Sequence, residues 1–190
     1  MSEFKTLKKK IFCIEGDWEN DLRKKSSIVG ILDLLHKVNN VEYIQDRNCS
    51  TKQEFISRLN QFKESKYKTY NILYLAFHGS SSTIHLGSET IDLDEIQEIL
   101  QDSLQGKIIY FGSCKTLKIK KEKINEFVDI TKANCLVGYT KDIDFIEGTA
   151  LDLLFFAKAQ QYFRPKNLTK NFKNSLSSLI SKQGLIIETN

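Results

Sequence analysis

The sequence contains a single proline and no stretch rich in glycine and serine, so nothing in it marks a linker between domains. No apolar run approaches the length of about 18 residues that crosses a membrane. The basic segment 1–10 lacks the apolar core and the small-residue cleavage site of a signal peptide. We therefore expect one domain over residues 1–190, a cytoplasmic location and no membrane partner.

Patterns that would bind a metal or a nucleotide are also missing. The four cysteines, Cys13, Cys49, Cys114 and Cys135, form no CxxC pair and no Cys/His group with the spacing of zinc ligands. Neither a GxGxxG nor a GxxxxGK phosphate loop occurs, which argues against a flavodoxin-like nucleotide or signalling domain. We expect no metal site and no organic cofactor.

The charge balance does not point to nucleic acid. The net charge is only +4, and the basic run Lys118–Lys123 contains no aromatic residue on which a base could stack. A solvated helix start is the simpler interpretation of this run, so we do not expect a nucleic-acid partner.

Short apolar segments recur along the chain with helical patterns between them. They read as continuous rather than alternating apolar runs, which is typical of parallel strands covered on both faces. The five segments are 10–15, 41–45, 71–77, 107–111 and 135–139. A further segment, 83–91, predicts a small hairpin that turns at Gly87 and Ser88.

Capping boxes predict helices that begin at Thr51, Asp92 and Asp144, each with a glutamate three residues later. The apolar residues Trp18, Leu22, Val29 and Leu32 suggest an amphipathic first helix, broken near residues 26–27. Segments 144–163 and 171–181 predict two further helices. The expected fold class is α/β, a three-layer sandwich with a mainly parallel central sheet.

Two of the apolar runs stop at a chemically capable side chain. The run 72–77 is followed by His78 and Gly79, and the run 108–111 by Gly-Ser-Cys114. If these runs are neighbouring parallel strands, roughly 4.8 Å apart, their carboxyl ends bring His78 and Cys114 together. Ligands of such folds gather beyond the carboxyl ends of the strands. We therefore predict a catalytic dyad in which His78 activates the Cys114 thiol.

Each residue also has a structural interpretation: a cysteine at a strand end is often a buried thiol, and a loop histidine is often only hydrogen-bonded. The other histidines, His36 on a predicted helix and His85 on the hairpin, are weaker candidates. With a dyad in place, the backbone amides of Gly79 and Cys114 would form the oxyanion hole, because Gly79 has no Cβ to block the substrate.

Acidic residues are frequent in the loops at this predicted edge. Asp142, Asp144 and Asp17 are candidate substrate-binding residues, which would suit a basic P1 side chain by charge complementarity. Asp144 has a competing role as the first residue of a capping box.

A hydrophobic strand that ends in His78-Gly79, followed by one that ends in Gly-Ser-Cys114, resembles the caspase-like cysteine peptidases. This clan includes caspases, metacaspases, gingipains, separase and bacterial CHAT domains. The CHAT and separase branch is the most similar, since a third strand is followed by a short acidic stretch, here 135–144, and then by a helix. The resemblance covers roughly 70–163 and implies a caspase-like fold and endopeptidase activity on protein substrates without a cofactor.

The sequence departs from the clan at two places. Phe111–Lys115 does not reproduce the glutamine-containing lead-in of caspases, so cleavage after aspartate is not expected. Tyr139 stands where CHAT domains often place a tryptophan.

The expected function is a cysteine endopeptidase, regulated by a protein activator, a protein inhibitor or a signal, in a bacterial defence or stress pathway. The alternative is a catalytically silent protein-interaction module on the same scaffold.

Overall fold

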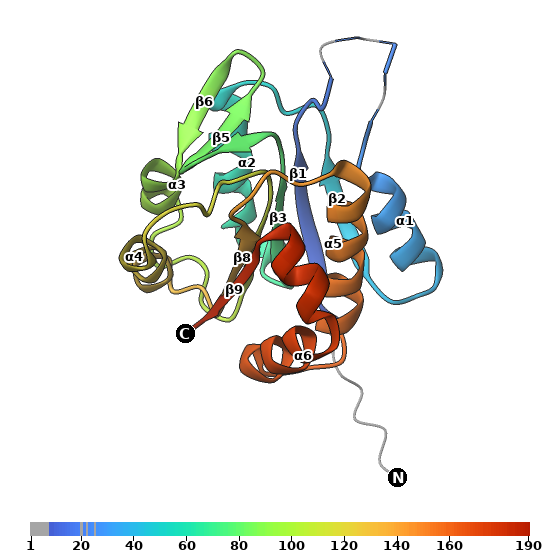
Figure 1. The fold of residues 1–190 in the computed structure, drawn as a ribbon. Helices are drawn as coiled ribbons and strands as arrows, with labels where there is room; N and C mark the ends of the chain where they lie inside the picture. Colours follow the sequence, from blue (N-terminus) through green and yellow to red (C-terminus); the bar gives the residue numbers. More distant parts are fainter. Residues whose placement is uncertain (1–7, 20, 22, 25) are drawn as a thin grey trace.

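The computed structural model describes residues 8–19, 21, 23–24 and 26–190 and shows an α/β architecture around one central sheet (Figure 1). The sheet has six strands in the order β2-β1-β3-β7-β8-β9. Their bounds are β1 (Lys10–Glu15), β2 (Glu42–Asp46), β3 (Tyr70–Ala76), β7 (Ile108–Gly112), β8 (Cys135–Tyr139) and β9 (Leu185–Thr189). The first five in this order run parallel, and β9 pairs antiparallel with β8. The predicted α/β class with a mainly parallel sheet is confirmed, whereas the sequence did not predict β9.

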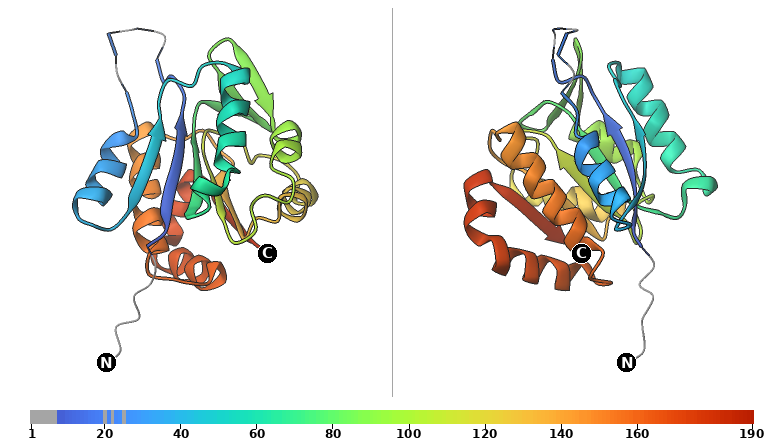
Figure 2. Two further views of the ribbon diagram at one scale, coloured as in Figure 1. Left: turned by 180° about the vertical axis from the view of Figure 1, so that it is seen from behind. Right: turned by 90° about the vertical axis from the view of Figure 1, so that its right-hand side faces the viewer.

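Helices cover both faces of the sheet, which makes three layers (Figure 2). One hydrophobic core joins the sheet to α2 (Lys52–Phe62), α3 (Leu93–Ile99) and α4 (Lys121–Thr131). The other joins it to α1 (Val29–Lys37), α5 (Phe145–Ala159) and α6 (Pro165–Gln183). A short 3-10 turn, η1 (Ser65–Tyr67), precedes β3. The continuous apolar runs of the strands follow from this double coverage.

A second sheet leaves the central one directly after His78. It consists of β4 (Gly79–Ser80), β5 (Thr83–Leu86) and β6 (Glu89–Asp92), all antiparallel. The predicted hairpin is confirmed, and Gly87 adopts a φ of 60° in its turn, which favours glycine. Asp92 then caps α3, so this small sheet connects the histidine loop to a helix.

The predicted helix starts at the capping boxes are confirmed. The side chains of Thr51, Asp92 and Asp144 accept hydrogen bonds from backbone amides in the first turns of α2, α3 and α5. Such caps satisfy amides that have no partner within the helix.

The prediction of a first helix from Trp18 onward is wrong. The helix α1 begins only at Val29, and Trp18 lies in a loop. Leu22, which contributed to the predicted stripe, lies outside the residues that the structure describes. The buried carboxylate of Glu15 accepts hydrogen bonds from Ser27 Oγ and Ile28 N, and so holds the chain directly before the first turn of α1.

The last helices differ from the predicted ranges at their ends. The helix α5 stops at Ala159 rather than continuing to 163, and α6 begins at Pro165, a residue suited to the first turn of a helix. None of the helices in the described part of the chain has both the length and the apolar character that a membrane span requires.

Candidate functional site

The structure brings His78 and Cys114 to one cavity at the carboxyl edge of the sheet. His78 follows β3 by two residues and Cys114 follows β7 by two, and these strands are paired neighbours with Ala76 opposite Gly112. Both side chains line a cavity of about 90 Å³, together with Trp18 from the loop after β1. His78 and Cys114 therefore lie together at this edge of the sheet, and their catalytic roles stay a prediction.

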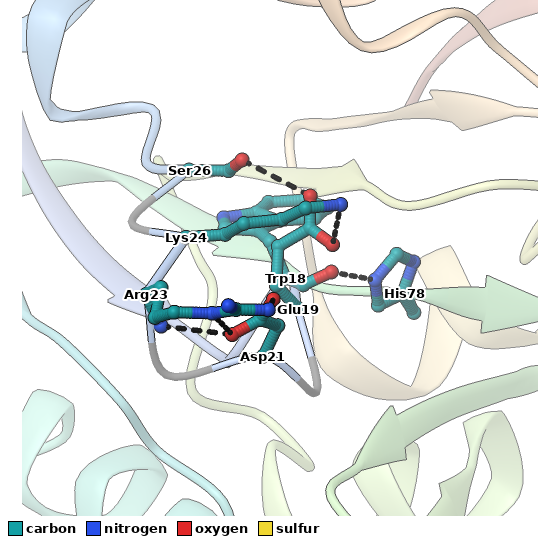
Figure 3. A network of polar contacts seen from close by, with 7 residues as sticks. All are labelled: Trp18, Glu19, Asp21, Arg23, Lys24, Ser26 and His78. Atoms are coloured by element: carbon teal, nitrogen blue, oxygen red, sulfur yellow. Dashed lines mark hydrogen bonds and ion pairs between the residues drawn. The ribbon is translucent and has the colours of Figure 1, made fainter.

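His78 is held by the backbone of the loop that follows β1. Its Nε2 lies 2.8 Å from the carbonyl oxygen of Trp18 (Figure 3). Because a carbonyl can only accept, Nε2 carries the hydrogen, and in the neutral ring Nδ1 is left as a proton acceptor. The indole ring of Trp18 also packs edge-on against the imidazole, with ring centroids 5.3 Å apart. These two contacts fix the tautomer and the orientation of His78.

The position of Trp18 depends on Glu15, the last residue of β1, whose exposed fraction is only 2%. The Glu15 carboxylate accepts a hydrogen bond of 2.6 Å from the indole Nε1 of Trp18, and others from Ser27, Ile28 and Gln45. A buried carboxylate is stable only when it is well hydrogen-bonded. Glu15 thus positions Trp18, and through it His78.

Cys114 differs from the other cysteines, all of which lie in the described part of the chain. Cys114 is half-buried, whereas Cys13, Cys49 and Cys135 are fully buried. Burial raises the pKa of Cys49 and of Cys135 to about 12 and the pKa of Cys13 well above its usual range. These three thiols are inert hydrophobic groups at neutral pH.

The sulfur of Cys114 contacts the backbone of the loop after β8. The amide of Ile143 donates to Cys114 Sγ at 3.5 Å, and the Ile143 carbonyl lies 3.9 Å from Sγ. Both contacts come from Ile143, so the loop after β8 positions the sulfur. Cys114 is therefore the one cysteine that is only half-buried and that lines the cavity.

A tight turn holds Cys114 at the strand end. Lys115 adopts a φ of 55°, which is uncommon for a residue with a side chain, and its amide donates to the carbonyl of Lys141 at 3.0 Å. Within the same turn, the buried hydroxyls of Ser113 and Thr116 form a hydrogen bond of 2.6 Å. Strained turns of this kind persist where surrounding contacts over-determine them, which is common at functional sites.

Gly79 lies directly against the Cys114 turn. A Cβ added at Gly79 would stand 2.4 Å from Thr116 Oγ1 and 2.9 Å from the carbonyl oxygen of Cys114, so no larger residue fits. The amide of His85 donates to the carbonyl of His78, which makes Gly79 and Ile84 a pair without mutual hydrogen bonds. The Gly79 amide therefore points away from β5, as an oxyanion donor would require.

The three aspartates predicted to bind substrate each have a definite place. Asp142 is exposed and forms an ion pair with Lys115, and the carboxylate of Asp144 caps α5. Asp17 is exposed and lines a second cavity of about 420 Å³, which adjoins the first at Trp18. None of the three is among the residues that line the cavity of His78 and Cys114. Their role in substrate binding stays a prediction.

The structure adds one acidic residue that the sequence interpretation missed. Asp152, on α5, lines the cavity and is 3% exposed. Its carboxylate accepts hydrogen bonds of 2.5 Å from the hydroxyls of Tyr74, Tyr110 and Tyr139. Burial raises the pKa of Asp152 to about 6, against the opposing effect of the three hydroxyl donors. Its signal in the sequence was a lone carboxylate within the apolar helix segment Leu151–Phe156.

The other two histidines, His85 and His36, lie outside the cavity of Cys114 and make contacts of their own. His85 Nε2 contacts Ser80 Oγ at 2.9 Å on the small sheet, and His36 Nδ1 contacts the carbonyl of Val41 at 3.2 Å. Within the residues that have described positions, no three His, Cys, Asp or Glu side chains are close enough to hold a metal ion.

Residues 8–184 match DUF6642, a family of unknown function, and because the match covers most of the chain, the protein belongs to this family. No curated protein matches the chain. The family description states no activity, so the chemistry of the site is the basis for a functional proposal.

Proposed function

We propose that this DUF6642 protein is a cysteine endopeptidase that uses Cys114 as nucleophile and His78 as general base. One observation carries the proposal: a half-buried cysteine and a histidine of fixed tautomer line the same cavity at the carboxyl edge of a parallel sheet. Nucleophile, base and a third group that orients the base are the parts that covalent catalysis requires. Here the third group is the carbonyl of Trp18.

In the proposed reaction, Nδ1 of His78 takes the proton of Cys114 Sγ, and the thiolate attacks the carbonyl carbon of the scissile bond. The protonated imidazole then gives this proton to the leaving amine, which departs as the thioester forms. The same imidazole then takes a proton from water as the oxygen attacks the thioester carbon; the C–S bond breaks, the acid product leaves, and the imidazole returns the proton to the thiolate of Cys114.

The developing oxyanion needs donors that are already in place. We assign this role to the amides of Gly79 and Cys114, because the two residues are in contact and the Gly79 amide is directed away from β5. The amide of Ile143 donates to Cys114 Sγ and holds the sulfur in place.

The same proposal includes membership of the caspase-like clan, near its CHAT and separase branch. The strand order, with a histidine after β3 and a cysteine after the neighbouring β7, supports it. We further propose protein substrates cleaved after a basic residue, control by a protein partner or a signal, and a cytoplasmic role in bacterial defence or stress. A basic preference is what charge complementarity with a carboxylate near the site predicts.

The decisive test compares the wild type with Cys114→Ala in hydrolysis of a fluorogenic peptide library. The wild type should cleave a subset of peptides, and Cys114→Ala should reduce the rate by at least about 10³-fold, since removal of a nucleophile leaves only binding effects. His78→Ala should produce a loss of similar size.

Cys135→Ala is the matched control, because Cys135 is fully buried at the start of β8 and does not line the cavity. It should retain the wild-type kcat/KM once folding is verified by circular dichroism. Hydrolysis that survives in Cys114→Ala would refute the proposal. A wild type that cleaves no peptide, and whose Cys114 is not acylated by peptide-based electrophiles, would favour a silent interaction module.

A further inference from the structure

The cavity beside the dyad presents hydrogen-bond acceptors deep inside it. The hydroxyl of Tyr74 gives its only hydrogen to Asp152 Oδ2, and the hydroxyl of Thr149 gives its hydrogen to the carbonyl of Phe145 at 2.5 Å. Both oxygens therefore face a ligand as acceptors only. Asp152 itself is a carboxylate with two oxygens, and all three residues line the cavity. A ligand group that enters must supply donors.

The carboxylate also supplies charge. Asp152 Oδ2 accepts one hydrogen bond, from Tyr74, while Oδ1 accepts two. Because a carboxylate can accept about four hydrogen bonds, capacity for a further donor remains. The tyrosine hydroxyls have no negative charge of their own, since burial beside Asp152 raises the pKa of Tyr74 and of Tyr110 well above 10. The charge in the cavity at neutral pH is that of Asp152.

The walls are aromatic. Trp18 and Phe145 pack edge-on against each other, with ring centroids 5.3 Å apart, and both line the cavity with Tyr74. Gly112 lets the ring of Tyr74 pack closely against β7, because a Cβ there would stand 2.7 Å from that ring. Aromatic rings attract a cation that approaches their faces and pack well against an alkyl chain.

We propose that this cavity is a subsite for a positively charged alkyl side chain, lysine or arginine, and that Asp152 is the residue that selects it. The inference rests on the proposed peptidase function and assigns the side chain before the scissile bond to this cavity, because Cys114 and His78 line it. A carboxylate ligand is repelled, and a neutral one leaves the charge of Asp152 without a partner. The aspartates of the loops have other contacts: Asp142 with Lys115, and Asp144 with the start of α5.

Two measurements test the subsite, and the first needs no catalysis. Calorimetry or ligand-observed NMR compares the binding of propylguanidine with that of propylurea, a neutral molecule of the same shape. The wild type should bind propylguanidine about tenfold or more tightly, the usual effect of one charge-assisted hydrogen bond. Asp152→Asn should remove the difference. Asp129→Asn, on the exposed side of α4 at the opposite face of the sheet, should keep it.

The second measurement compares kcat/KM for peptides with arginine, lysine, citrulline or norleucine before the scissile bond. The charged residues should be preferred at least tenfold in the wild type and not in Asp152→Asn. Should Asp152→Asn fail to fold, the wild-type comparison of propylguanidine with propylurea decides alone.

Each outcome has one meaning for the subsite. Equal binding of the two small molecules overturns it, as does a difference that Asp142→Asn abolishes and Asp152→Asn leaves intact. Preferential binding of propylguanidine without any peptide hydrolysis supports the subsite and counts against the peptidase. Hydrolysis that depends on Cys114 but ignores the charge of that residue supports the peptidase and overturns the subsite.

Discussion

Replacing Asp152 by asparagine should change how the stability of the protein depends on pH. Burial raises the pKa of Asp152 from 3.8 to about 6 in the folded protein. As pH rises from about 4 to 6, the unfolded chain loses this proton while the folded protein keeps it. The native state then binds more protons than the unfolded state, so Asp152 makes the free energy of unfolding fall over this range.

The size of the effect follows from the two pKa values. A rise from 3.8 to about 6 corresponds to a total loss of about 3 kcal/mol above pH 6. Linkage between pH 5 and pH 7 accounts for about 1.3 kcal/mol of this loss. Four buried neighbours of Asp152 do not titrate in this interval, because burial raises the pKa of Cys13, Tyr74, Tyr110 and Tyr139 well above their usual ranges.

Urea unfolding gives the free energy of unfolding of the wild type and of Asp152→Asn at pH 5 and at pH 7. The effect is the change, between the two pH values, in the stability difference between the two proteins. Titrating groups remote from Asp152 contribute equally to both proteins and cancel. Relative to Asp152→Asn, the wild type should lose about 1.3 kcal/mol of stability between pH 5 and pH 7. If the gap between the two proteins is the same at both pH values, then burial does not raise the pKa of Asp152 into this range, and the linkage argument is refuted.

Two further predictions concern Gly79 and the thiols. Gly79→Ala should lower the free energy of unfolding by about 1–3 kcal/mol, because the added methyl group overpacks against Thr116 Oγ1 and the Cys114 carbonyl. The control Gly30→Ala, in open space on α1, should raise it by about 0.5–1 kcal/mol. Thermal unfolding checks both, and unchanged stability of Gly79→Ala would contradict the close contact. Iodoacetamide should modify Cys114 first in the native protein, because the other three thiols are fully buried, and mass spectrometry after limited labelling identifies the site. Earlier labelling of Cys49 would contradict the assigned burial.

The elements that the sequence predicted best are those in which one local signal decides. The strand over residues 10–15 has the predicted bounds, and the side chains of Thr51 and Asp92 cap helices as the capping boxes indicated. Parallel pairing of β3 with β7 was also predictable, because both are apolar runs that must be covered on two faces. These signals were enough to place His78 and Cys114 at one edge.

The misplaced elements depend on contacts between distant residues. The spacing of the apolar residues from Trp18 to Leu32 predicts a helix. In the structure, the indole of Trp18 donates to Glu15 and its carbonyl accepts from His78, and these contacts hold Trp18 in a loop. Helical periodicity is a weak preference that one buried carboxylate with several donors can outweigh. The sequence does not predict β9, because this short edge strand, antiparallel to β8, has no alternating or bounded apolar pattern that marks it as a strand.

Asp152 differs from the predicted acidic residues in its place: those lie in loops at the edge of the sheet, whereas Asp152 reaches the cavity from α5. Three strands place a tyrosine four residues before the residue that each contributes to the site: Tyr74 before His78, Tyr110 before Cys114, and Tyr139 before Ile143. All three hydroxyls donate to one carboxylate on α5, which ties the ends of β3, β7 and β8 together at the level where the loops leave the sheet. The spacing of these loops and the charge of the cavity therefore depend on the same side chain. A single carboxylate within an apolar helix, opposite tyrosines on adjacent strands, is thus as informative about this site as the cysteine and the histidine at the strand ends.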